Sequence, residues 1–111
     1  MSRAAVAPAP TPDAWSFYVV RCGDGSLYAG IAKDARARFR AHAEGKGAKY
    51  TRGRGPLELL RVVVCGAKGD ALAVEARFKR RSRAEKLRLV GRKARLAAFA
   101  RRVVDARALT R

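Results

Sequence analysis

Two apolar runs separated by a short polar segment in the first third of the chain predict a β-hairpin. Residues 15–21 (WSFYVVR) are rich in aromatic and β-branched residues, and residues 26–31 resume an apolar run. Gly23, Asp24 and Gly25 lie between the two runs and supply turn chemistry. We therefore expect two antiparallel strands joined by a short turn.

The apolar spacing changes to the period of an α-helix directly after the hairpin. Asp34 is a good N-cap, and Ala35, Phe39 and Ala43 recur every four residues. Gly45 then ends the pattern, because glycine is unfavourable inside a helix. We expect this helix to pack through its three apolar residues.

A third strand and a second helix are predicted in the middle of the chain. Residues 57–65 are dense in Leu and Val, which is typical of a strand. Residues 70–80 have apolar residues at helical spacing, and we expect Leu72, Ala76 and Phe78 to face inward.

The last part of the chain is predicted to be helical and basic. The segment 82–85 has the form of a capping box and opens a third helix. Residues 79–111 hold 13 Lys and Arg against two carboxylates. Leu96, Phe99 and Val103 still recur at near-helical spacing, so we expect part of this tail to fold back on the domain.

These elements predict an α/β (α+β) fold with a small three-stranded sheet, antiparallel or mixed, flanked by helices. A length of 111 residues suits a single domain. We divide the chain into an Ala/Pro-rich disordered arm at 1–14, a folded domain at 15–91 and a basic helical tail at 92–111.

The charge of the chain indicates the kind of partner. The 26 Lys and Arg outnumber nine Asp and Glu, which gives a formal net charge of +17. The commonest partner of such a surface is a phosphate backbone, with anionic membrane lipid as the rival polyanion. No apolar run approaches the roughly 20 residues that span a bilayer, and no secretory signal is visible. We expect a cytoplasmic monomer that binds nucleic acid and no membrane.

Cysteine usage indicates neither a zinc site nor a disulfide scaffold. Cys22 and Cys65 lie 43 positions apart without a CxxC pair, and the chain has one histidine. We expect two buried or half-buried thiols. A bridge between them stays open if their strand ends are neighbours, although a reducing cytosol disfavours it.

Six short segments in a fixed order carry a family resemblance. They are SFY, CGDGSLYAG, DARARFRAH, GKGAKYTRGRGP, DALAVE and KRRSRAEKLRLV, and they run from about Trp15 to Val90. Their order and spacing resemble the small single-domain bacterial proteins of the GIY-YIG nuclease superfamily. The first motif reads Ser-Phe-Tyr instead of Gly-Ile-Tyr, and Ala29 stands in the middle of the second. Neither departure removes a reactive side chain.

The resemblance implies hydrolysis of a phosphodiester bond by residues that lie far apart in the sequence. It implies catalytic roles for Tyr18, Tyr28, Arg38 and His42, and a metal-binding role for Glu75. One carboxylate with waters suits Mg²⁺, or Mn²⁺ in its place. An arginine would neutralise the charge that develops on the phosphoryl group.

The identity of the general base is the open point of this chemistry. Tyr28 is our candidate, with Tyr18 orienting the water or sharing its proton. An unperturbed tyrosine has a pKa of about 10, so only a strongly cationic pocket makes it a base at neutral pH. His42 lies four residues after Arg38 on one helix face, and it substitutes as the base or acts as a hydrogen-bond partner.

Each candidate also has a purely structural interpretation. Aromatic residues in a hairpin, such as Tyr18 and Tyr28, usually pack in a core or across strands. Arg38 stands among other arginines of a solvated face, and a lone helical histidine is more often structural than catalytic. Glu75 has Lys79 one helical turn away as an ion-pair partner.

A basic loop between the first helix and the third strand is the expected nucleic-acid contact. Residues 45–56 (GKGAKYTRGRGP) combine cations and glycines with one aromatic residue. We expect the nucleic-acid contacts to come from this loop and from the second helix, through Lys46, Lys49, Tyr50, Arg52, Arg54 and Lys79.

Three functions fit the sequence. The first is a metal-dependent endonuclease that cuts single-stranded, flapped or branched DNA in DNA repair or nucleic-acid processing, near the bacterial nucleoid. The second is a DNA- or RNA-binding protein that keeps the fold and cleaves weakly or not at all. The third is an RNA- or ribosome-associated protein without an active site. The endonuclease is favoured, because a pure binder has no need for a carboxylate that faces an anionic ligand.

Overall fold

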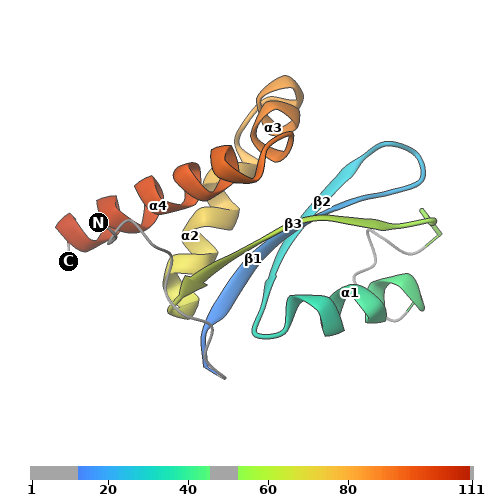
Figure 1. The fold of residues 1–111 in the computed structure, drawn as a ribbon, viewed down its shortest axis with the longest axis horizontal. Coiled ribbons are helices and arrows are strands. Elements are labelled where there is room, and N and C mark those ends of the chain that lie inside the picture. Colours follow the sequence, from blue (N-terminus) through green and yellow to red (C-terminus); the bar gives the residue numbers. More distant parts are fainter. Residues whose placement is uncertain (1–12, 46–52, 111) are drawn as a thin grey trace.

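The computed structural model describes residues 13–45 and 53–110. In chain order the elements are β1 (Trp15–Arg21), β2 (Leu27–Ala32), α1 (Ala35–Ala43), β3 (Glu58–Gly66), α2 (Lys68–Lys79), α3 (Arg83–Val90) and α4 (Lys93–Thr110). Figure 1 shows α1 on one side of the sheet and α2, α3 and α4 on the other. The predicted disordered arm lies outside the described residues up to position 12, and Ala14 is buried.

The sheet is antiparallel throughout, with β1 in its centre and the strand order β2-β1-β3. Tyr18 of β1 lies opposite Gly30 of β2 and opposite Val62 of β3. The predicted hairpin and the predicted three-stranded sheet with flanking helices are confirmed. Of the two strand arrangements considered, the antiparallel one is observed.

The central strand β1 divides the buried side chains into two clusters, because successive side chains of a strand point to opposite faces. Phe17 and Val19 are fully buried in the larger cluster, to which α2, α3 and α4 contribute. Tyr18 and Val20 lie in the smaller cluster, together with Ala35 of α1. The sheet therefore has one core face and one face covered by α1.

The helix α1 begins as predicted but presents a different residue to the sheet. Asp34 caps it, since its Oδ1 accepts a hydrogen bond from the backbone N–H of Ala37 at 3.0 Å. Ala35 is buried, whereas Ala43 is exposed and His42 is buried in its place. The expectation for Ala43 is wrong because seven residues complete nearly two turns of a helix, so position 42 lies almost directly above position 35.

The helix α2 packs through residues other than those expected. Phe78 is buried as predicted, but Leu72 is 45% exposed and Ala76 is also exposed. The inward residues are Ala71 and Val74, which lie on the same helical stripe as Phe78. The prediction for Leu72 and Ala76 is wrong. Apolar residues occur on more than one face of this helix, and packing against the sheet determines which face is buried.

The helix α4 contributes to the same core as the sheet. Leu96, Phe99 and Val103 are buried in the larger cluster. At the other end of the helix, Nε of Arg107 donates a hydrogen bond to Oδ1 of Asp70 on α2 at 2.8 Å. The basic C-terminal segment is thus anchored to the domain through both apolar and ionic contacts.

Both cysteines are buried free thiols, which is the arrangement expected from the sequence, and they do not form the disulfide bridge that was the alternative. Cys22 follows β1 and Cys65 lies near the end of β3. Within residues 13–45 and 53–110, no helix has the length and apolar content needed to cross a membrane.

Candidate active site

A buried tyrosine and a buried histidine form the centre of the α1 face. Tyr18 comes from the middle of β1, and His42 comes from the last turn of α1. The two residues are 1% and 2% exposed, and the Tyr18 hydroxyl lies 2.9 Å from Nε2 of His42. The hydroxyl oxygen and the ring nitrogen are each other's hydrogen-bond partner. A buried polar group without a partner would cost about 1–3 kcal/mol of stability.

The protonation states of this pair follow from burial. Burial raises the pKa of Tyr18 to about 12; Tyr28 adds to the rise, and the charge of Arg38 opposes it. Burial lowers the pKa of His42 from its ordinary value, and the positive charge of Arg38 lowers it further. At neutral pH a phenol therefore faces a neutral imidazole. With the imidazole proton on Nδ1, Tyr18 donates this hydrogen bond and Nε2 of His42 accepts it.

Tyr28 of β2 completes an aromatic cluster around the pair. Its ring centre lies 5.1 Å from that of His42 in an edge-to-face arrangement, and 6.4 Å from that of Tyr18. Tyr28 is half-buried, in contrast to Tyr18. Of the two phenols, Tyr28 is therefore the one that is accessible to a ligand from solution.

Gly30 allows the Tyr18 side chain to lie flat against the edge strand. It stands directly opposite Tyr18, and a Cβ at this position would lie 2.7 Å from the Tyr18 hydroxyl oxygen. Such a contact is too short for any side chain, so the tyrosine requires glycine here. The glycine of the second motif is thus part of the packing that directs Tyr18 toward His42.

Arg38 lies one helical turn before His42 and is exposed. Its charge acts on the pKa of both Tyr18 and His42, which places the guanidinium within electrostatic range of the cluster. The fold therefore brings residues of β1, β2 and α1 together on one face of the sheet, namely Tyr18, Tyr28, Arg38 and His42.

The model of the GIY-YIG catalytic domain family matches residues 14–88, which include this whole cluster. The chain belongs to the GIY-YIG family. Similar proteins carry the name UPF0213. One from Vibrio cholerae is 44% identical over 89 residues, which cover 79% of this chain and 88% of that one. Another, from Streptococcus sanguinis, is 50% identical over 70 residues, which cover 63% of this chain and 80% of that one.

A solution NMR structure of a UPF0213 protein from Bacillus halodurans is also similar to this GIY-YIG domain. The two chains are 42% identical, the alignment covers 70% of this chain and 83% of that one, and the TM-score is 0.48. The family match ends at residue 88, so α4 lies beyond it.

Glu75 of the GIY-YIG domain comes from a different helix than Arg38 and His42. It belongs to α2, which packs on the opposite side of the sheet from α1 (Figure 1). Its side chain is 19% exposed, and its Oε2 lies 3.2 Å from Nζ of Lys79. Across the described residues, no group of three or more His, Cys, Asp or Glu is arranged to hold a metal ion. A metal at Glu75 would therefore take its other ligands from waters and phosphate oxygens, which fits Mg²⁺.

The expected nucleic-acid contacts of the GIY-YIG domain lie mostly outside the described residues. This applies to Lys46, Lys49, Tyr50 and Arg52. Arg54 is described, and its guanidinium lies 2.6 Å from Oδ2 of Asp24 at the hairpin turn. Lys79 pairs with Glu75. The side chains of both described cations are partly exposed, at 41% for Arg54 and 55% for Lys79.

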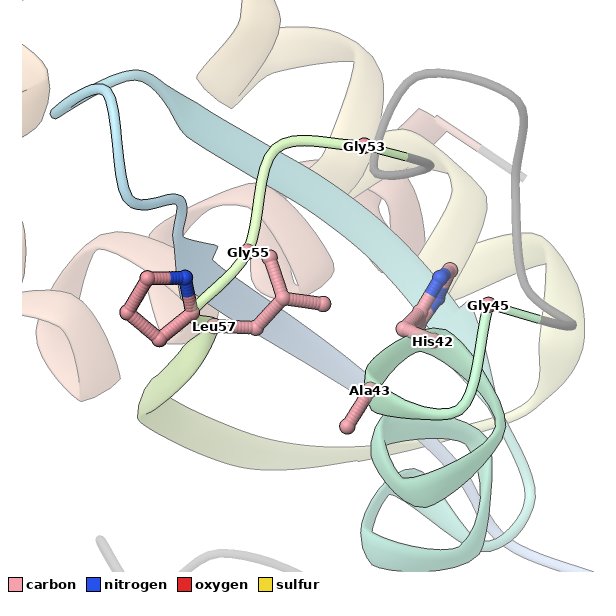
Figure 2. A pocket seen from close by; sticks show the side chains of 7 residues that line it. His42, Ala43, Gly45, Gly53, Gly55 and Leu57 are labelled. Atoms are coloured by element: carbon pink, nitrogen blue, oxygen red, sulfur yellow. The ribbon is translucent and has the colours of Figure 1, made fainter.

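Sequence reasoning missed a pocket beside His42 in this GIY-YIG domain. Figure 2 shows it between the C-terminal end of α1 and residues 53–57. Its lining consists of His42, Ala43, Gly45, Gly53, Gly55, Pro56 and Leu57. The glycines of the segment GRGP were the available signal, but we interpreted them only as parts of a basic loop.

Proposed function

We propose that this GIY-YIG domain is a metal-dependent endonuclease that hydrolyses phosphodiester bonds in DNA. The observation that carries the proposal is the 2.9 Å hydrogen bond between Tyr18 and His42, with Tyr28 in ring contact and the charge of Arg38 beside it. The membership of the GIY-YIG catalytic domain family supports a nuclease reaction. The net charge of +17 supports a polyanionic substrate.

The two tyrosines have different roles in the proposed mechanism. Tyr18 stays protonated at neutral pH, because its pKa is raised to about 12. It therefore orients other groups through its hydrogen bond with His42. Tyr28 is more accessible and lies next to the attacking water. Arg38 is exposed, contacts the phosphate and neutralises the negative charge that develops on it during the reaction.

The proposed metal ligand is Glu75, with Mg²⁺ or Mn²⁺ as the ion. A bound divalent ion supplies positive charge to the phosphoryl group and lowers the pKa of water. For Glu75 to act in this way, its carboxylate must exchange the partly exposed Lys79 for the ion. We further propose that the substrates are single-stranded, flapped or branched DNA, with a role in DNA repair or nucleic-acid processing in the bacterial cytoplasm.

A second candidate function is DNA or RNA binding without cleavage. The ion pair of Glu75 with Lys79 favours it, because a carboxylate held by a lysine is a weaker metal ligand than a free one. The two candidates share the fold and the basic surface, and they differ in whether the phosphodiester bond breaks.

A cleavage assay separates the two candidates. Labelled single-stranded, duplex, flapped and branched DNA and RNA are incubated with the protein and Mg²⁺, Mn²⁺ or EDTA. We expect cleavage only with a divalent ion, and a loss of roughly 100-fold in rate for Arg38→Ala, because it removes transition-state charge stabilisation. Glu75→Gln should abolish the dependence on metal together with the activity.

Arg102→Ala, which removes an exposed arginine of α4, is the matched control and should cleave like the wild type. If the wild type cuts no substrate under any condition, the binding function stands instead. Equal rates for Arg38→Ala, Glu75→Gln and the control would also overturn the nuclease proposal.

A further inference from the structure

The described lining of the pocket beside His42 differs in chemistry from the surface of this basic protein. The pocket has a volume of about 340 Å³. None of the seven described residues that line it carries a carboxylate, an ammonium or a guanidinium group. Three of them are glycines, and a Cβ at Gly45, Gly53 or Gly55 would meet no atom within 4 Å. These three positions therefore have room for the first atom of a side chain.

The lining suits a flat ligand with an apolar face and polar edges. Pro56 and Leu57 offer apolar surface and His42 offers a ring. The backbone N–H of Gly45 is already bonded to the carbonyl of His42, so Gly53 and Gly55 are the glycines left to supply polar backbone contacts. Pockets for small ligands start at roughly 300 Å³. A pocket of this size takes one nucleobase and excludes a base that remains paired and stacked in a duplex.

The pocket adjoins the proposed catalytic groups through His42. This residue lines the pocket (Figure 2). It also bonds to Tyr18 at 2.9 Å, and its ring centre lies 5.1 Å from that of Tyr28. On the far side, the backbone N–H of Gly23 donates to the carbonyl of Arg54 at 2.6 Å, and the Arg54 side chain pairs with Asp24. The wall formed by residues 53–57 is therefore fixed to the hairpin turn.

We propose that this pocket receives one unstacked nucleobase next to the phosphate that is cut, which makes DNA with unpaired nucleotides the substrate class. The inference rests on the proposed function for the position of that phosphate. Flipping a base out of an intact duplex costs a few kcal/mol, and the cost is least for a base that is already single-stranded. The protein therefore binds and cuts single-stranded and flapped DNA in preference to fully paired duplex.

Binding without cleavage tests the pocket separately from the nuclease reaction. Single-stranded DNA that carries 2-aminopurine and a fully paired duplex of equal length are titrated with the full-length protein in EDTA. Ala43→Leu adds volume at the exposed C-terminal end of α1, where Ala43 lines the pocket. We expect it to weaken single-strand binding by about tenfold, or about 1.4 kcal/mol, because the base loses its stacking contact. Duplex binding should not change.

Two further variants complete the test. Ala98→Leu makes the same substitution at an exposed alanine of α4 and should bind both DNAs like the wild type. Gly55→Leu adds a side chain on the other wall, where a Cβ would meet no atom within 4 Å and the backbone φ is not positive. We expect it to lose the 2-aminopurine fluorescence response of the wild type, with an unchanged unfolding midpoint.

The outcomes distinguish this inference from the proposed function. If Ala43→Leu and Gly55→Leu bind single strands as tightly as the wild type, or weaken duplex binding equally, the base pocket is overturned, even if the wild type cleaves DNA. If both variants lose single-strand binding but the wild type cleaves nothing, the base pocket stands and the nuclease proposal fails.

Discussion

The two faces of the sheet carry different chemistry although they share the central strand β1. On the face toward α2 and α4, Phe17 packs edge-to-face on Phe78, with ring centres 5.3 Å apart, and the surrounding cluster is apolar. On the face toward α1, the neighbouring Tyr18 bonds to buried His42. The comparison indicates that one face fixes the position of β1, and the other face uses that fixed backbone to align polar side chains.

The largest expected effect on stability comes from the apolar face. Phe78 is 2% exposed and also contacts Phe99, with ring centres 6.4 Å apart. Phe78→Ala should lower the free energy of unfolding by about 3–5 kcal/mol, because it removes a buried ring and leaves a cavity. Urea unfolding measures this loss. Phe78 shares α2 with the proposed metal ligand Glu75, so cleavage per folded molecule is measured at saturating Mg²⁺ and should stay near the wild-type level. A fall in parallel with stability would mean that this face also positions the site.

A smaller loss of stability with a larger loss of function is expected on the α1 face. In Gly30→Ala the new Cβ would lie 2.7 Å from the Tyr18 oxygen, so the phenol must shift, which disturbs its 2.9 Å hydrogen bond with His42. We expect a cost of about 1–3 kcal/mol from overpacking, measured by urea unfolding, and reduced cleavage.

The double variant Gly30→Ala with Tyr18→Phe sharpens this prediction. Removing the hydroxyl relieves the closest contact, so the double variant should recover part of the stability that Gly30→Ala loses. Strictly additive losses would contradict the proposed clash between the new methyl group and the phenol.

The sequence predicted the elements of this comparison better than their packing. The hairpin and the cap at Asp34 depend on local residue types, which a sequence displays directly. The burial of His42 in place of Ala43 depends on which face of α1 packs against the sheet. The sequence alone did not distinguish between two neighbouring faces of this helix. The role of Gly30 depends on the strand register that sets it against Tyr18, so a motif could indicate the glycine but not its contact.

The smallest expected effect is a dependence of stability on pH. The pKa of His42 is lowered in the folded protein, from an ordinary value of 6.5, by burial and by Arg38. The unfolded chain therefore binds a proton more readily, and the contribution of neutral His42 to stability is complete above pH 6.5 and is lost as the pH falls through the lower folded-state value. Urea midpoints at several pH values measure it. His42→Gln should flatten this part of the profile; an unchanged profile would mean that His42 titrates alike in both states.

The most direct test of the central claim is the rate of Mg²⁺-dependent cleavage of single-stranded DNA by the wild type, Arg38→Ala and Arg102→Ala, at matched unfolding midpoints. We predict cleavage by the wild type and by Arg102→Ala, with a loss of roughly 100-fold for Arg38→Ala alone. Equal rates for the three folded proteins, or no cleavage by the wild type, would contradict a catalytic site on the α1 face.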